Sequence, residues 1–183
     1  MKEYLSSFII GSFLNYSTFA IYDISLRIIR VLIIPSTILI KTMFPEFAIQ
    51  RSKKMFQKTE ILSLGYSLII MIIVIIIPDS TLKHLIDEDV VTFKKVLYIL
   101  IIMLPLLSLC GTRGTLKLIS FNQEKQFTKG ILISIIVYFT LLFLLYFTLG
   151  FNLIGIVIII LLSLISELIS HLYYGKKIIF LNE

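Results

Sequence analysis

The sequence is poor in charge: only 15% of its 183 residues are Asp, Glu, Lys or Arg, whereas 58% are hydrophobic. A soluble domain of this length needs a polar face on each surface helix, and so few charged residues cannot supply it. The shortage of charge therefore excludes an ordinary soluble globular domain and indicates lipid as the solvent around most of the chain.

Cysteine is almost absent as well. The single Cys110 lies in an apolar run, so the sequence predicts neither a disulfide framework nor a cysteine-based metal site. No secretory signal peptide is expected, because Glu3 stands beside Lys2 and the apolar stretch that follows is broken at Asn15 without a small-residue cleavage site. We expect the membrane-spanning segments themselves to direct insertion.

Motifs for catalysis are missing too. The sequence has no glycine-rich phosphate loop with its lysine, no Ser/His/Asp set on loops and no facing pair of carboxylates. The net charge of +6 does not point to nucleic acid, because the basic residues fall at the ends of apolar runs rather than among aromatics and glycines. We therefore predict neither an enzyme nor a nucleic-acid-binding protein, and neither a cofactor nor a metal.

Long apolar runs are what the chain has in abundance. A helix needs about 20 apolar residues to cross a bilayer, and the runs predict one all-α integral membrane domain over residues 1–183. Five spans are predicted, at residues 21–44, 61–78, 96–116, 130–149 and 153–174. The stretch before them, YLSSFIIGSFLNYSTF, is too short and too polar for a sixth span and looks like the stub of another helix.

Basic residues are distributed unevenly among the connections. QRSKKMFQK, FNQEKQFTK and the tail GKKIIFLNE are basic, whereas PDSTLKHLIDEDVVTFKK offsets its lysines with acids and GFN is neutral. Because basic loops are retained in the cytoplasm, the basic connections are predicted to face inward, with the chain starting outside and ending inside. We expect a multi-pass protein of the inner (plasma) membrane.

Charged residues interrupt the first predicted span. At about 100° per residue, one face of this helix collects a polar stripe within about 40° of one direction. The polar stripe consists of Asp23, Arg27, Arg30, Thr37 and Lys41. Such a stripe can face protein or water but not lipid tails. Pro35 predicts a bend or a loosening near the middle of the helix.

Two interpretations of the polar stripe stay open. In one, Asp23 and Lys41 lie at the two membrane interfaces and the arginines snorkel outward, although Arg30 lies roughly 6 Å from the span midpoint, which is deep for snorkelling. In the other, Arg27 and Arg30 line a wet cavity and contact the phosphates of an anionic lipid-linked substrate, because a guanidinium offers two parallel donors and stays charged.

Two further pairs at i, i+4 spacing are candidates. Arg113 and Lys117, near the cytoplasmic end of the third span, fit either positive-inside anchoring or substrate contact. Glu167 and His171 fit either an interfacial polar pair or a proton-coupling site, and two ligands without a third predict no metal site.

Four stretches together resemble the C-terminal half of the Wzx-type lipid-linked oligosaccharide flippases, within the larger family of multidrug, oligosaccharide-lipid and polysaccharide exporters. They are similar to that family's eighth helix, its outer loop with the tenth helix, the segment that follows, and the last helix pair with its glycine turn at Gly150 and Gly155. The stretches are FAIYDISLRIIRVLIIPSTILIKTMFPEFA, IIIPDSTLKHLIDEDVVTFKKVLYILIIMLPLLSL, GTRGTLKLISFNQEKQFTKGILISIIVYF and LGFNLIGIVIIILLSLISELISHLYY.

The resemblance implies one lobe of a two-lobe transporter whose six-helix lobes enclose a central cavity with alternating access. The short start would be the stub of the seventh helix, and a separate N-terminal lobe would be a partner. The implied function is to flip a polyprenyl-pyrophosphate-linked oligosaccharide to the outer leaflet for surface polysaccharides such as the O-antigen of lipopolysaccharide. Two alternatives stay open: a cation or drug antiporter of the same superfamily, which should bury more acid than base, and an inactive or structural membrane fragment.

Overall fold

Helices account for the regular structure in the residues that the computed structural model describes, which are 2–77, 89–176 and 178. The α-helices are α1 (Lys2–Phe13), α2 (Tyr16–Leu32), α3 (Ile34–Gln50), α4 (Lys53–Ile76), α6 (Val90–Ile101), α7 (Met103–Cys110), α8 (Glu124–Leu149) and α9 (Leu153–Gly175), and the π-helix η1 covers Gly111–Ile119. The all-α class predicted from the sequence is confirmed for these residues.

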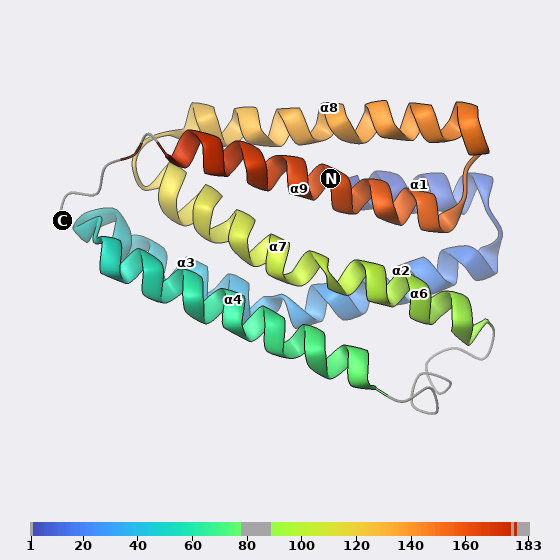
Figure 1. The fold of residues 1–183 in the computed structure, drawn as a ribbon, viewed down its shortest axis with the longest axis horizontal. Coiled ribbons are helices and arrows are strands. Elements are labelled where there is room, and N and C mark those ends of the chain that lie inside the picture. The colour runs from blue at the N-terminus through green and yellow to red at the C-terminus, as the bar shows by residue number, and fades with distance from the viewer. Residues whose placement is uncertain (1, 78–88, 177, 179–183) are drawn as a thin grey trace.

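The helices form an elongated bundle of two layers (Figure 1). α8 packs on α9, α9 packs on the rod made by α6, α7 and η1, and α7 packs on α4. Behind them in this view, α1 contacts α2 and α9, α2 contacts α6, and α3 contacts α4 and η1. The main apolar core lies where α1, α2, α6, α7 and α9 meet.

Four helical segments of the described chain are long and apolar enough to cross a membrane. They are Lys53–Ile76, Val90–Ile119, Glu124–Leu149 and Leu153–Gly175. Each overlaps one of the last four predicted spans over nearly the whole length of that span. Residue 78, at the end of the predicted span 61–78, lies outside the described residues. The structure therefore supports an all-α membrane protein.

The first predicted span, residues 21–44, is divided between α2 and α3 at Ile33. Pro35 explains the interruption, because it has no N–H to donate to the carbonyl group four residues earlier. The Tyr66 hydroxyl donates to the Leu32 carbonyl at 3.1 Å, which satisfies a backbone acceptor at the break. The predicted loosening at Pro35 is confirmed. α2 and α3 have 17 residues each, and each therefore rises about 26 Å. Neither is among the helical segments long and apolar enough to cross a membrane. The count of five spans stays a prediction.

Large apolar side chains cover the outward faces of α4 and α8, the helices at opposite edges of the bundle. A soluble protein rarely leaves continuous apolar faces in water, whereas a membrane protein presents them to lipid. The exposed residues include Ile61, Ile69, Ile72 and Ile76 on α4 and Ile136, Phe139, Phe143 and Phe147 on α8.

Buried serines join the helices across the interior. The Ser108 hydroxyl of α7 lies 2.8 Å from the Ser36 hydroxyl of α3 and also hydrogen-bonds with Ser67 of α4. Small side chains let helices approach closely in a membrane, and their hydroxyls then bridge the helices. This serine cluster fixes α3, just after its interruption, against α4 and α7.

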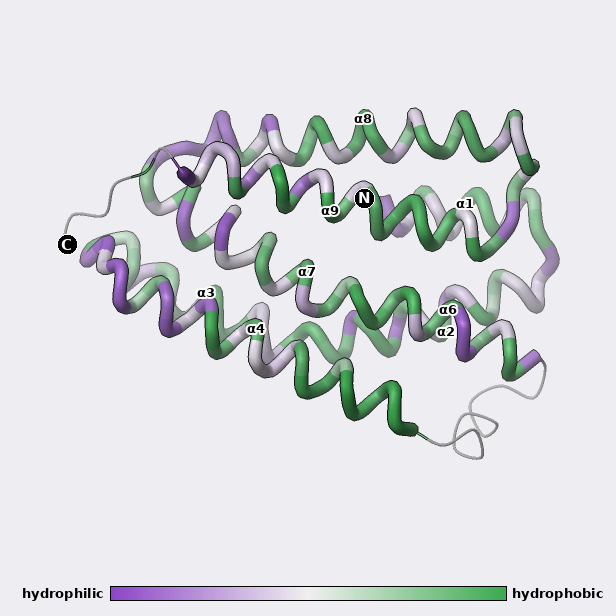
Figure 2. The backbone as a smooth tube through the Cα atoms, viewed as in Figure 1, coloured by the Kyte–Doolittle hydropathy of each residue, from purple (hydrophilic) through white to green (hydrophobic). Residues whose placement is uncertain are grey.

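The basic connections gather at one end of the bundle. The α3–α4 turn, the η1–α8 turn and the end of α9 lie there, and Figure 2 shows hydrophilic residues around them. The α1–α2 turn, the α8–α9 turn and the start of α6 lie at the opposite end. At that opposite end, the Asp89 carboxylate accepts hydrogen bonds from the hydroxyl and the backbone N–H of Thr92, which hold the pKa of Asp89 below its ordinary value.

We predict that the basic end faces the cytoplasm, because lysines and arginines concentrate there. In a Cys110→Ala background, an impermeant thiol reagent added to intact cells should label Val91→Cys, whose native side chain is exposed at the other end. The same reagent should label Gln50→Cys, at the end of α3 next to the α3–α4 turn, only after the cells are permeabilised. The reverse pattern would invert the orientation and weaken the resemblance to flippases.

Candidate functional site

Arg30, a predicted candidate of the polar stripe, is tied to α1. Its Nε and Nη2 donate to the Glu3 Oε2 at 3.2 and 3.1 Å. The guanidinium carbon also lies 4.9 Å from the centre of the Tyr4 ring. Tyr4 begins the stretch that the sequence analysis treated as a helix stub and Glu3 directly precedes it, so these partners were missed.

Glu167, a predicted coupling residue, is tied to the same helix. The Lys2 Nζ lies 3.1 Å from the Glu167 Oε2 and 2.6 Å from the Ser134 Oγ. The Ser134 hydroxyl donates to the same Oε2 at 3.0 Å. Adjacent residues of α1 therefore join α2 to α9, and we call this set the α1 junction: Lys2, Glu3, Arg30 and Glu167.

The α1 junction borders a small cavity of about 120 Å³. Lys2, Glu3 and Glu167 contribute to its lining, together with apolar side chains of α7 and α9. The cavity gives water or a small ligand room beside these charges. Charged groups inside a membrane bundle are expensive to retain, and they commonly mark a functional pathway.

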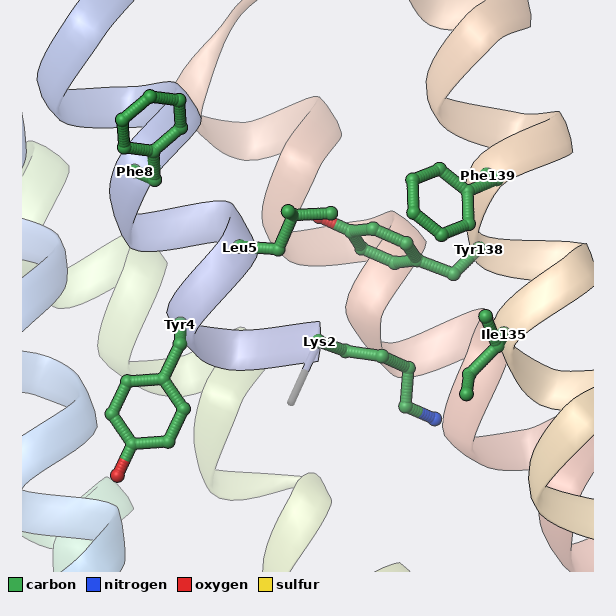
Figure 3. Close-up of a pocket in the computed structure, with 7 residues that line it drawn as sticks. All are labelled: Lys2, Tyr4, Leu5, Phe8, Ile135, Tyr138 and Phe139. Carbon is green, nitrogen blue, oxygen red and sulfur yellow. The ribbon is translucent and has the colours of Figure 1, made fainter.

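An apolar pocket of about 320 Å³ lies on the other side of Lys2, between α1 and α8. Figure 3 shows Lys2 reaching from the first turn of α1 toward Ile135, while Tyr138 projects from α8 into the space between the two helices. A second apolar pocket of about 400 Å³ shares Phe139 with the first and continues toward Phe151. Together they make an apolar groove with one ammonium group in its lining.

The rest of the polar stripe lies at the bundle surface. Arg27 forms an ion pair with Asp23 at 2.7 Å, as its i, i+4 spacing predicts, yet 74% of the Arg27 side chain is exposed. Lys41 is exposed and makes no ion pair within the described part of the chain. The Arg30 side chain is less exposed than that of Arg27, at 39%.

Arg113 and Lys117 turn toward the protein interior. Arg113 donates from Nε and Nη2 to the two carboxylate oxygens of Glu60 on α4, at 2.5 and 3.0 Å. Lys117 is only 9% exposed, and its Nζ lies 5.7 Å from the centre of the Phe56 ring. Anchoring and substrate contact both stay predictions for this pair. Glu60 was another partner that the sequence analysis missed.

His171 is buried against other helices, with 1% of its surface exposed, and both interpretations of the Glu167 and His171 pair stay predictions. Its ring stacks on Phe127 with the centroids 5.2 Å apart. Two glycines make room for it: a Cβ added at Gly114 or Gly130 would lie 2.8 or 2.7 Å from the imidazole. The glycines of η1 and α8 therefore leave space for the His171 ring of α9, and we call this space the histidine slot.

Cys110 is the third residue at this slot. Its thiol, a carboxylate oxygen of Glu167 and a ring nitrogen of His171 all lie within 4.8 Å of one another. The structure thus brings together three potential ligand atoms that the sequence analysis did not group, and the expectation of no cysteine-based metal site stays a prediction. The sequence gave no signal for the grouping, because Cys110 ends α7 whereas the other two residues lie on α9.

We predict that the histidine slot tolerates no added methyl group. Gly114→Ala and Gly130→Ala should each destabilise the protein by about 1–3 kcal/mol, because the ring is held from both sides and overpacking forces it or the backbone to shift. Gly65→Ala is the matched control, since nothing lies within 4 Å of its added Cβ. Thermal unfolding in detergent should show lower midpoints for the first two variants only. Equal midpoints for all three would contradict the packing described here.

In the described residues, these features define an all-helical membrane protein that holds charged side chains, and a cysteine, a glutamate and a histidine close together, among its helices. Comparison with protein-family models, with curated proteins and with solved structures finds no match for this chain. The flippase resemblance therefore depends on the sequence stretches alone, and the function below is a proposal.

Proposed function

We propose that this chain is one lobe of a membrane transporter that flips a polyprenyl-pyrophosphate-linked oligosaccharide from the cytoplasmic to the outer leaflet for surface polysaccharide assembly. The observation that carries the proposal is the exposure of the polar stripe on α2 and α3, where Arg27 is 74% exposed. The flippase resemblance supplies the class of substrate.

The exposed stripe needs a polar neighbour in the membrane. A charge left in hydrocarbon is unfavourable by roughly 2.5–3.5 kcal/mol on insertion scales, so arginines at this depth face protein or a water-filled cavity. Within the described residues, no helix covers Arg27 or Lys41. A second lobe placed against α2 and α3 would enclose the stripe in a cavity, as the resemblance implies.

The chemistry of the charged side chains suits a lipid pyrophosphate. Arg30 uses Nε and Nη2 for Glu3, and Nη1 has no acceptor among the described residues, so it keeps donors for a phosphate oxygen. The interruption at Ile33 lies about one helical turn after Arg30, and the helix can bend there. The apolar groove beside Lys2 adds a surface compatible with an isoprenoid chain.

A structural role without transport is the second candidate. The pairing of Arg30 with Glu3 and of Arg113 with Glu60 favours it, because each arginine then holds two helices together. A cation antiporter is less well supported, since the partly buried acid Glu167 is paired with Lys2 rather than left in surplus.

Transport in proteoliposomes tests the proposal. The chain is reconstituted with a matching N-terminal lobe, and the transbilayer movement of a polyprenyl-pyrophosphate-linked sugar is compared with that of the same sugar on an uncharged polyprenyl lipid. Charge-assisted hydrogen bonds of about 1.5–3 kcal/mol predict a preference of roughly ten- to a hundredfold for the pyrophosphate lipid. Equal movement of both lipids, or movement of neither, would contradict the proposal.

A further inference from the structure

We propose that Cys110, Glu167 and His171 form a binding site for one divalent transition-metal ion of the Zn²⁺ type. Their ligand atoms lie within 4.8 Å of one another, at the contact between α7 and α9. This site is separate from the polar stripe, and the proposal does not depend on the transported substrate.

The donor set is that of a zinc site with an open position. Zinc takes cysteine sulfur at about 2.3 Å and imidazole nitrogen or carboxylate oxygen at about 2.0–2.2 Å, and sites with three protein ligands leave a fourth place for water. Donors of one tetrahedral ion lie about 3.3–3.8 Å apart on these bond lengths, so only a small inward movement is needed. On binding, the Cys110 thiol loses its proton to solvent and its sulfur bonds the metal.

His171 is the second, independent observation. It is 1% exposed, and within the described residues neither Nδ1 nor Nε2 has a hydrogen-bond partner at normal distance and angle. A buried polar group without a partner is unfavourable, and native proteins rarely retain one. A metal ion between His171 and Cys110 would satisfy one nitrogen.

Glu167 is oriented to contribute. Its contacts with Lys2 and Ser134 both use Oε2, which leaves Oε1 without a hydrogen-bond partner in the described part of the chain. Hydrogen bonds of this kind fix a ligating carboxylate and tune its affinity for metal. Lys2 also offsets part of the negative charge that the carboxylate and a thiolate would bring together.

The surrounding structure holds the ligands in place. The imidazole is clamped between Phe127 and the two slot glycines, Gly114 and Gly130. Cys110 immediately precedes the π-helix η1, a conformation that is rare and often found at functional sites. Glu167 also lines the cavity of about 120 Å³, which leaves room beside this ligand.

The test measures metal binding by the full chain, purified in detergent with a tag that contains no histidine and stripped of metal. Zn²⁺ should bind in a one-to-one ratio, and Co²⁺ should give the charge-transfer absorption of a thiolate ligand. Cys110→Ser, Glu167→Gln and His171→Gln should each weaken Zn²⁺ binding at least tenfold, and Cys110→Ser should remove the absorption. His84→Ala, at the only other histidine of the chain, should change neither signal.

Size-exclusion profiles that match the unaltered chain show that each variant is folded, and Cys110→Ser changes a single atom type. Failure of the unaltered chain to bind zinc would overturn the proposal. Zinc bound without the thiolate absorption, or lost in His84→Ala, would also overturn it, because the ion would then occupy a different site.

Discussion

Replacing Arg30 with alanine in the complete transporter is expected to reduce glycan export ten- to a hundredfold while leaving membrane insertion intact. The estimate follows from the loss of one charge-assisted hydrogen bond to the substrate, which is worth about 1.5–3 kcal/mol. Arg30→Lys should recover only part of the export, because an ammonium keeps the charge but not the two parallel donors. The measurement is surface polysaccharide per unit of membrane-inserted protein.

The ion pair with Glu3 provides the control for this prediction. If Arg30 acts only as a brace between α2 and α1, Glu3→Gln should impair export as much as Arg30→Ala does, since either change breaks the same pair. If Arg30 contacts the substrate, Glu3→Gln should leave most of the export. The double variant Arg30→Leu with Glu3→Gln removes both charges, so it should insert well and still fail to export. Near-normal export by this double variant would end the substrate-contact hypothesis.

The four long apolar helices could be predicted from the sequence because apolar runs of sufficient length have few alternatives in a membrane. The interruption at Ile33 was also predictable, since Pro35 lacks a backbone N–H whichever neighbours the helix has. The i, i+4 pair of Asp23 and Arg27 forms as its spacing indicates, because both residues lie on one helix. Such local features follow from neighbours in the chain.

The partners of the other charges could not be predicted, because they come from helices far apart in the sequence. Glu3 lies 27 residues from Arg30, and Glu60 lies 53 residues from Arg113. Helical periodicity assigns a residue to a face of its own helix but does not say which helix covers that face. The slot around His171 shows the same limit, since it needs glycines from η1 and α8 around a side chain of α9.

A second large effect is expected from the N-terminal lobe. This chain expressed by itself should restore no glycan export to a cell that lacks its flippase. The exposed polar stripe would then face lipid or a foreign protein, and half of the cavity that should hold the substrate would be missing. Co-expression with a matching N-terminal lobe should bury the stripe against a partner and restore export.

Complementation of the flippase-deficient cell tests the central claim most directly, namely that this chain is one lobe of a lipid-linked oligosaccharide flippase. Surface polysaccharide is measured for the chain alone, for the N-terminal lobe alone and for both together, at equal levels of membrane-inserted protein. The account predicts polysaccharide only when both lobes are present, and its loss when the chain carries Arg30→Ala. Full export by the chain alone, or none with both lobes correctly inserted, would contradict it.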